Sequence, residues 1–378
     1  MPSEPLRTEV VVGLPAFEGL APGWDALVAA MPRPSPFLLH DLCATWWGRA
    51  GATEQPVIVV ARRGARLVAA LPLEVRSVAG TRIASFPGRH SSALADLLID
   101  PDEPRETALA LLDRLRDAPY DIAWLYGLPG DSKLASVASD LRLSERVESP
   151  VLEMPDGFDE ILKTRVRGDH RRGRNRHLRQ LAEEGTMEFA VARTPDELTR
   201  DLPEAFDLMA RRREGLPDDS GFSTPEGRRY YLALARRLGP RDVLRLLTLR
   251  LDGRMIAFEL YYVVATTMVF SMIAFEPDLR RFSPGKLAFY ESNAQASAEG
   301  ARRIELLGRL DQYKRELHPE LAPLYVGVGL ARGARGQAAG AALWVAIEGR
   351  RRARDSERLR RIYVEGLAPL RRLRSRIG

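Results

Sequence analysis

A polar, basic loop between a strand-like segment and a helix-like segment has the residues to bind a phosphate group. Residues 267–275 have the Thr, Val and Phe content of a strand, and the following helix opens at Gly285-Lys286. A helix N-terminus offers main-chain N–H groups and the positive end of a dipole. Arg280, Arg281 and Lys286 add positive charge. The loop therefore predicts a pyrophosphate site.

The same loop has a purely structural alternative. Ser283 and Pro284 suit an N-cap and a first helical turn, with the neighbouring arginines solvated. The two roles are compatible, because a capped helix still presents positive charge at its start.

Two glutamates in the apolar strand region are candidates for a general base. Glu259 interrupts the apolar segment 255–264, where a carboxylate needs a partner or a purpose. Glu276, at the end of the next strand, is the second candidate. An outward-facing or ion-paired side chain is the alternative for Glu259.

The sequence lacks the spacings of several common catalytic sites. Its five histidines are scattered and form no HExxH pattern, and there is neither a GxSxG elbow nor a GxxxxGK[ST] loop. Cys43 is the only cysteine, so no intramolecular disulfide and no Cys₄ or Cys₂His₂ zinc site can form. We expect no metal.

Charge is concentrated in two elements. The net charge is +6, but residues 163–179 hold eight basic residues against one acid, and residues 350–376 hold eleven arginines against three acids. The rest of the chain is therefore acidic, which excludes a uniformly basic nucleic-acid binder. The first basic segment predicts contact with an acidic acceptor, a tRNA or an anionic membrane surface, or a solvated face. The second suits a helix on a membrane surface or between domains.

The pattern of elements predicts two halves with the same organisation. Each half alternates helices and strands, and hairpin turns are expected at residues 63–66 and at Asp252-Gly253. Residues 267–307 read strand–helix–strand and predict parallel pairing. Residues 141–155 are expected to be a connector. The fold class is therefore α/β (α+β), with a mixed, mostly antiparallel sheet flanked by helices in each half.

Several motifs resemble the GNAT acyltransferase superfamily, and in particular its tandem-domain, CelD-type acetyltransferases, which are distantly related to the Fem peptidyltransferases. In the second half they are SPGK (283–286), Ala-Glu-Gly (298–300), RRIELLG (302–308) and Tyr313-Lys314. In the first half they are Pro36-Phe37, Trp46-Trp47 and ALPL (70–73). The loop departs from the family pattern in having a single glycine, Gly285, and Glu305 stands where the family has Asp.

The resemblance implies an acyl donor, acetyl-CoA or another acyl-CoA, and assigns roles to individual residues. The pyrophosphate would meet Arg280, Arg281, Ser283, Gly285 and Lys286. Tyr313 would be the acid for the leaving thiolate, beside the bases Glu259 and Glu276. Arg171, Arg172 and Lys314 would contact the acceptor.

The resemblance also implies three regions and a function. Residues 1–150 would be a degenerate GNAT-like domain, residues 151–333 the acyltransferase domain, and residues 334–378 a basic helical extension. The expected reaction is direct acyl transfer to an amine, or to a hydroxyl, on a sugar or cell-envelope polysaccharide precursor. The alternatives are a Fem-like transferase that uses aminoacyl-tRNA, and a non-catalytic scaffold on an anionic polymer or membrane.

The expected location follows from the ends and the composition of the chain. The N-terminus has no basic start followed by an apolar run, so we expect no secretory signal. A single cysteine fits a reducing compartment. We expect a cytoplasmic protein, with peripheral contact at the inner face of the membrane as an alternative.

Overall fold

The computed structural model describes residues 4–88, 93–214 and 221–355. The first half of the chain alternates strands and helices in a regular order. Its elements are β1 (Leu6–Val12), α1 (Leu14–Glu18), α2 (Ala21–Ala29), the short 3₁₀ helix η1 (Pro36–Leu38), α3 (His40–Trp47), β2 (Gln55–Arg63), β3 (Arg66–Val78), β4 (Thr81–Ser85), β5 (Leu98–Ile99), α4 (Arg105–Leu115), β6 (Ile122–Pro129), α5 (Lys133–Val137) and β7 (Arg142–Glu153).

The second half repeats this order with longer helices. Its elements are α6 (Phe158–Thr164), α7 (Gly168–Glu184), β8 (Met187–Ala192), α8 (Pro195–Arg212), α9 (Pro225–Leu238), η3 (Gly239–Arg241), β9 (Leu244–Leu251), β10 (Arg254–Val264), β11 (Thr267–Phe275), η4 (Pro277–Phe282), α10 (Pro284–Ala298), β12 (Arg303–Glu305), α11 (Gln312–Arg315), β13 (Glu320–Gly329) and α12 (Gly333–Asp355).

One continuous sheet of 13 strands runs through both halves. The order is β1-β2-β3-β4-β6-β13-β7-β12-β11-β10-β9-β8, and β5 pairs with β3. The pairs are antiparallel except β4 with β6 and β11 with β12. The expected fold class, a mixed and mostly antiparallel sheet flanked by helices, is confirmed.

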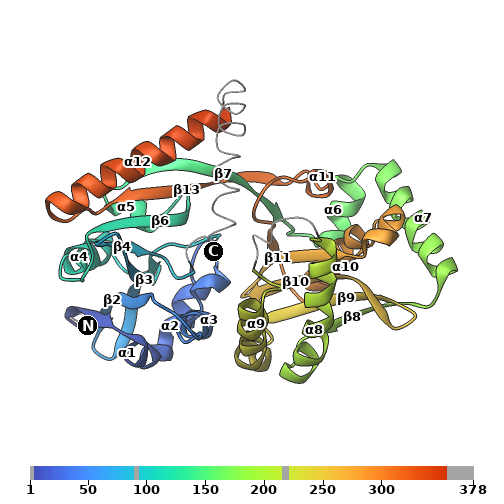
Figure 1. The fold of residues 1–378 in the computed structure, drawn as a ribbon, viewed down its shortest axis with the longest axis horizontal. Coiled ribbons are helices and arrows are strands. Elements are labelled where there is room, and N and C mark those ends of the chain that lie inside the picture. Colours follow the sequence, from blue (N-terminus) through green and yellow to red (C-terminus); the bar gives the residue numbers. More distant parts are fainter. Residues whose placement is uncertain (1–3, 89–92, 215–220, 356–378) are drawn as a thin grey trace.

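The halves are joined by an exchange of strands in the middle of the sheet. β13 lies late in the chain, yet it pairs on one side with β6 and on the other with β7 (Figure 1). The end of β7 in turn pairs with β12. The prediction of a connector at residues 141–155 was therefore wrong, because those residues form a strand of 12 residues. Their partners lie between 150 residues (Glu153 with Arg303) and 186 residues (Arg142 with Val328) away in the chain, so no local pattern marks them.

Helices cover the second half of the sheet on opposite faces. Side chains of α8 and α9 pack in one apolar cluster with Leu246, Phe258 and Tyr262. Side chains of α10 pack in another with Leu247 and Tyr261. Successive residues of β9 and β10 thus point to opposite faces, as strand geometry requires. In the first half, α12 covers β4, β6 and β13 from above (Figure 1).

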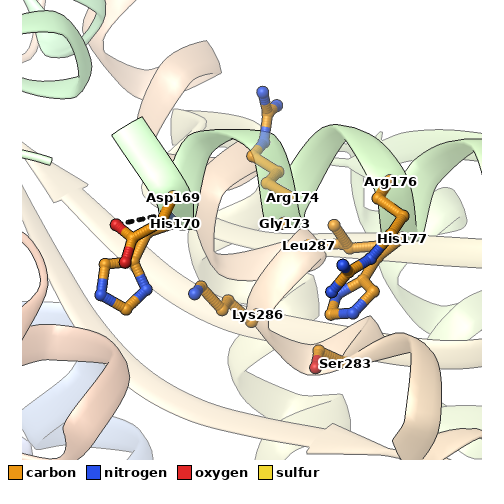
Figure 2. Close-up of a pocket in the computed structure, with 9 residues that line it drawn as sticks. All are labelled: Asp169, His170, Gly173, Arg174, Arg176, His177, Ser283, Lys286 and Leu287. Atoms are coloured by element: carbon orange, nitrogen blue, oxygen red, sulfur yellow. Dashed lines mark hydrogen bonds between the residues drawn. The ribbon is translucent and has the colours of Figure 1, made fainter. Parts of the chain in front are cut away.

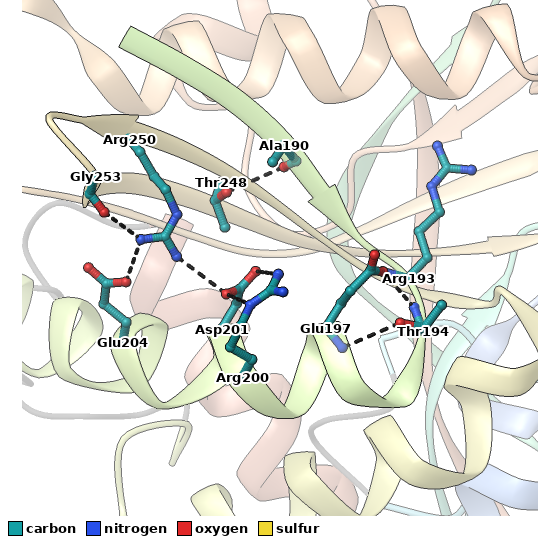
Figure 3. A network of polar contacts seen from close by, with 10 residues as sticks. All are labelled: Ala190, Arg193, Thr194, Glu197, Arg200, Asp201, Glu204, Thr248, Arg250 and Gly253. Atoms are coloured by element: carbon teal, nitrogen blue, oxygen red, sulfur yellow. Dashed lines mark hydrogen bonds and ion pairs between the residues drawn. The ribbon is translucent and has the colours of Figure 1, made fainter. Parts of the chain in front are cut away.

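Helix α8 is attached to the sheet by a polar network (Figure 3). Its first turn is a capping box in which Thr194 and Glu197 bond to each other's main chain. The Arg250 guanidinium of β9 donates to Glu204 of α8 at 2.7 Å and to the Gly253 carbonyl at 2.8 Å. These bonds orient α8 relative to the β9–β10 hairpin.

A buried ion pair joins the two halves at the end of β12. Arg33, from the loop before η1, donates two bonds to the Glu305 carboxylate at 2.8 and 2.6 Å. Arg303 donates to the same carboxylate at 3.0 Å. Arg33 is 6% exposed and Glu305 is fully buried. Glu305 therefore depends on a cation supplied by the other half.

None of the described helices is long and apolar enough to cross a membrane. Of the expected basic extension, residues 334–355 form most of α12. The remainder of that prediction, residues 356–378, lies outside the described residues.

We predict that Arg33→Met lowers the free energy of unfolding by about 3 kcal/mol, because it leaves Glu305 buried with only Arg303 to compensate it. Chemical denaturation measures the change. Arg229→Met, which removes an exposed pair with Glu226, is the control and should cost less than about 1 kcal/mol. Adding Glu305→Gln to Arg33→Met should recover part of the loss. Equal effects of the two single variants would contradict this account.

Candidate active site

The sheet opens where β11 and β12 separate. The two strands pair only between Thr267–Val269 and Arg303–Glu305, and β11 continues to Phe275 without that neighbour. On its other side β11 bulges: Leu260 faces Met272 and Tyr261 faces Phe270, which leaves Ser271 without a partner in the register. A bulge bends its strand and increases the local twist. These features create a gap that crosses the sheet.

A cleft of about 1100 Å³ lies over this gap, between the two halves of the chain. Its lining comes from β11, from the segment after β12, from α9, and from α3 with the loop after β4. The first half contributes Phe37, Leu42, Trp46, Arg49, Pro87, Gly88 and Ala93. The second half contributes, among others, Arg212, Tyr230, Tyr231, Tyr262, the segment 270–273, Leu307, Gly308, Arg309, Asp311, Tyr313 and Lys314.

Lys314 lies at the cleft but its ammonium group is already bonded. Nζ donates to the carbonyls of Leu306 at 3.0 Å, Leu307 at 2.8 Å and Arg309 at 3.3 Å. The residue is 2% exposed. Burial lowers the pKa of Lys314 to about 8, and Asp311 and Glu259 oppose that shift. In this structure Lys314 fixes the loop after β12.

Tyr313 contributes its side chain to the cleft from the side of α10. Its ring contacts Phe289 edge to face, with centroids 4.9 Å apart. Burial, reinforced by the charges of Glu259 and Asp311, raises the pKa of Tyr313 well above its ordinary value. The phenol therefore keeps its proton at neutral pH, as a general acid must.

Glu259 does not line the cleft. It lies on β10, on the face covered by α10, and is fully buried. Among the described residues neither carboxylate oxygen completes a hydrogen bond. Burial raises the pKa of Glu259 well above its ordinary value, and Ser292 and Lys314 oppose the shift. Glu259 is near enough to Tyr313 and Lys314 to affect the pKa of each, but its side chain is not part of the cleft lining.

Glu276 is held in a structural ion pair. Its carboxylate accepts bonds from Arg254 at 2.5 Å and from Arg211 at 3.2 Å, and it is 5% exposed. These bonds tie α8 to the ends of β10 and β11. Glu276 is not among the residues that line the cleft.

The start of α10 opens on a second, smaller pocket of about 220 Å³ beneath α7 (Figure 2). Ser283, Lys286 and Leu287 line it from α10, and the rest of the lining comes from α7. The α7 residues are Asp169, His170, Gly173, Arg174, Arg176 and His177. The turn expected to bind a pyrophosphate is thus open to a basic pocket.

The loop residues of the predicted pyrophosphate site differ in their positions. Arg280 and Arg281 are exposed, and Arg281 bonds to Glu184 of α7 at 2.9 Å. Ser283 has a left-handed backbone with φ 52°, and α10 begins without a side-chain cap. Ser283 does occupy the N-cap position and Pro284 the first turn, as the structural alternative expected, but the Ser283 side chain makes no capping hydrogen bond. A Cβ atom at Gly285 would lie 2.8 Å from the Phe275 ring, so only glycine fits there.

Positive charge dominates the small pocket but is partly balanced. Burial, together with Arg176 and Lys286, lowers the pKa of His177. Lys286 forms an ion pair with Glu316, which also accepts a bond from the Tyr290 hydroxyl at 3.2 Å. An anion in this pocket would face His177 and Arg176 and would compete with Glu316 for Lys286.

Arg171 and Arg172, predicted to contact the acceptor, are exposed on α7 and line neither the cleft nor the small pocket. The Arg171 guanidinium donates to the Leu162 carbonyl at 2.9 Å and to the Val166 carbonyl at 3.0 Å. It therefore stabilises the carbonyl end of α6.

In the first half the equivalent gap between parallel strands is filled. β4 and β6 pair only at Ile83–Ala84 with Ile122–Ala123. Beyond this point the chain itself occupies the gap, and the Ala95 N–H donates to the Gly127 carbonyl at 3.0 Å. A Cβ at Gly127 would lie 2.8 Å from the Ala93 carbonyl oxygen. In the second half, no part of the chain that the structure describes fills the corresponding gap in this way.

The sequence did not reveal the first-half residues of the cleft. Trp46 donates its indole N–H to Glu74 at 2.8 Å, and Trp47 donates to the same oxygen at 3.0 Å. Glu74 is fully buried, and burial raises its pKa to about 7 although both indoles oppose the shift. The Arg49 guanidinium stacks 3.5 Å from the Trp46 ring centre. Phe37 and Trp46 belong to motifs that carried the family resemblance, but that resemblance gave them no place in the cleft.

Comparison with known proteins identifies the domain that contains the open gap. The family model of the acetyltransferase (GNAT) domain matches residues 168–315, so the second half carries a GNAT-type acetyltransferase domain. No curated protein matches the chain.

Solved structures with a similar fold cover most of the chain. FemX is 12% identical and has a TM-score of 0.60 over 80% of this chain and 94% of its own. L-PGS from Bacillus licheniformis is 13% identical, with a TM-score of 0.51 over 87% and 94%. A tandem GNAT protein from the clavulanic acid biosynthesis pathway is 15% identical, with a TM-score of 0.47 over 86% and 99%. The CelD-type assignment remains a prediction.

In the part of the chain that the structure describes, no group of three or more His, Cys, Asp or Glu side chains is placed to hold a metal ion. His90, one of the five histidines, lies outside the described residues.

We predict that Glu74 makes the folded protein less stable as the pH rises. Its folded pKa of about 7 lies above that of an unfolded glutamate, so the folded state binds a proton that the unfolded state has lost. Stability should therefore fall between about pH 4.5 and about pH 7. In Glu74→Gln the loss of unfolding free energy from pH 5 to pH 8 should be smaller by about 2 kcal/mol.

Chemical denaturation at the two pH values measures this difference. Glu188→Gln, at an exposed position of β8, is the control and should retain the wild-type pH difference. A Glu74→Gln variant with the same pH difference as the wild type would show that Glu74 does not titrate in this range.

Proposed function

We propose that the second half transfers an acyl group from an acyl-CoA, with acetyl-CoA as the simplest donor, to an amine held in the cleft between the halves. The observation that carries the proposal is the gap between β11 and β12, which opens to the cleft beside a helix start in a basic pocket. When bound, the donor supplies the thioester whose acyl group is transferred. A sugar or cell-envelope polysaccharide precursor with a free amine is the expected type of acceptor, and a hydroxyl acceptor is the alternative.

The residues at the start of α10 fit the diphosphate of such a donor. No side chain caps this helix, so no side-chain oxygen accepts a hydrogen bond from its first main-chain N–H groups. Lys286, Arg176 and His177 surround the pocket, and burial, together with the charges of Arg176 and Lys286, lowers the pKa of His177. A bound anion would offset the positive charge of Arg176 and Lys286. The exposed Arg280 and Arg281 add charge around the entrance.

Tyr313 and Asp311 are two groups at the cleft that can transfer a proton. The Tyr313 phenol keeps its proton and can give it to a leaving sulfur. Asp311 is exposed at the cleft and can accept a proton from the acceptor ammonium through water. Because Glu259 lies under the gap and Glu276 is ion-paired, we assign them positioning roles in place of the predicted base.

The first half serves as a wall of the acceptor cleft. We propose domain boundaries at residues 1–150 and 151–333, followed by the extension at 334–378. The filled gap between β4 and β6 supports a degenerate first domain, and the exchanged strands β7 and β13 hold the two domains together.

Aminoacyl-tRNA is the second candidate donor. Arg172, Arg176 and Arg179 are exposed on α7, and Arg176 lines the pocket at the start of α10. Such a face favours a polyanion. Binding of tRNA that weakens steeply as salt rises, together with no binding of acetyl-CoA, would favour this candidate.

We predict that acetyl-CoA binds to the whole chain and that Lys286→Ala and Arg176→Ala each weaken binding at least tenfold. Each substitution removes a cation from the small pocket. Isothermal titration calorimetry measures the affinity. Arg179→Ala is the control, because this arginine is exposed on the same helix but does not line the pocket. No heat with the wild-type protein at millimolar acetyl-CoA would reject the donor.

We also predict that Tyr313→Phe lowers kcat about 100-fold while acetyl-CoA affinity changes little, because only the proton donor is lost. Thiol release from acetyl-CoA, with hydroxylamine as a small acceptor amine, measures the rate. Tyr325→Phe on β13, away from the cleft, is the control. Unchanged turnover in Tyr313→Phe would remove the acid role.

A further inference from the structure

Aromatic side chains from both halves of the chain line the wall of the cleft. Two edge-to-face pairs cross between the halves: Trp46 with Tyr230, centroids 5.8 Å apart, and Phe37 with Tyr262, 6.0 Å apart. All four residues line the cleft. Neither half alone builds this aromatic surface, so a ligand that contacts it is held by both halves.

The tyrosines make this surface amphipathic. Tyr230 and Tyr231 form no hydrogen bond through their hydroxyl groups within the described residues, although both side chains are largely shielded and burial raises the pKa of each. Flat apolar rings with hydroxyl tips match a ligand ring that has an apolar face and polar edges, as a sugar ring has. Aromatic faces also attract an ammonium group.

The charge at the cleft is positive, and part of it is not compensated. Among the described residues no carboxylate pairs with the guanidinium of Arg212 or of Arg309, and both side chains are exposed at the cleft. Arg212 stacks over the Phe275 ring at 4.7 Å. Arg49 is also at the cleft, fixed by Trp46 and by Glu54 at 2.7 Å. A guanidinium group without a partner favours a carboxylate or phosphate ligand.

The size of the cleft limits the ligand. A volume of about 1100 Å³ is at the upper end for small-molecule sites and suits a molecule of one or two rings. A purely apolar chain would remove the guanidinium groups from water without offering them a partner, which costs free energy.

We propose that the acceptor is a ring-bearing amine that also carries an anionic group, a carboxylate or a phosphate. Its ring lies against Trp46 and Tyr230, and its anionic group meets Arg212 and Arg309. The proposal rests on the proposed function for the role of acceptor, but binding of this class of ligand does not require the acyl donor.

Calorimetry with the whole chain, without acyl donor, tests the proposal with four probes. Glucosamine 6-phosphate and muramic acid carry both the ring and the anion, glucosamine carries only the ring and the amine, and phosphoethanolamine carries only the amine and the anion. We expect at least one of the first two to bind ten or more times more tightly than either of the last two. Which of the two binds distinguishes phosphate from carboxylate.

Two variants localise the binding. Arg212→Ala should reduce the preference for the anionic sugar over glucosamine at least fivefold, and Trp46→Leu should weaken both sugars. Trp46→Phe, which keeps a ring, should retain most of the affinity. Arg236→Ala, exposed on α9 outside the cleft, is the control.

Specific outcomes would overturn the proposal. One is that the wild-type protein binds neither anionic sugar. Another is that it binds glucosamine or phosphoethanolamine as tightly as it binds the anionic sugars. The third is that Arg212→Ala leaves the preference for the anionic sugar over glucosamine unchanged. Acetyl-CoA binding is measured separately. Acetyl-CoA binding without sugar binding would reject this inference and leave the proposed function standing. Sugar binding without acetyl-CoA binding would support this class of ligand and reject acetyl-CoA as the donor.

Discussion

The exchange of β7 and β13 is the constraint on which the rest of the structure depends. β13 pairs with β6 of the first half and with β7, and β7 continues into a pair with β12 of the second half. Main-chain hydrogen bonds therefore run without interruption from one half to the other. The two walls of the cleft cannot separate without breaking a sheet ladder. The Arg33–Glu305 pair reinforces this junction at the point where β11 and β12 part.

The two halves use the same strand order for different purposes. Each contains a short parallel pair from which two strands diverge. In the first half the chain after β4 fills the gap, and Asp96 bonds there to the Ser132 hydroxyl at 2.7 Å and to the first N–H groups of α5. Among the residues that the structure describes, no such segment enters the gap of the second half, and the cleft lies over it. A gap that the chain's own main chain fills leaves no room for a ligand. The same strand arrangement therefore occurs in both halves, but the cleft lies at the gap of the second half.

The elements were predictable where local pattern determines them. The hairpin at Asp252-Gly253, the strand at 267–275 and the helix that opens near Gly285 follow from turn residues and local pattern, and the structure has them at these positions. β7 was missed because it is polar, contains Pro150 and pairs only with distant strands. The direction of Glu259 was also beyond local pattern, since sequence alone does not fix which face of a buried strand points to the cleft. Trp46, Arg49 and Tyr230 come from segments far apart in the chain, so only the folded structure brings them together.

The floor of the cleft is held by charge as well as by apolar packing. Leu307 has a left-handed backbone with φ 45°, a conformation that costs free energy for a branched, non-glycine side chain. Lys314 donates to the Leu307 carbonyl and to two neighbouring carbonyls, which offsets that cost. A buried ammonium group is itself unfavourable, and Asp311 and Glu259, on either side of the gap, favour its charged form. Lys314 thereby holds the loop that carries Arg309 and Tyr313.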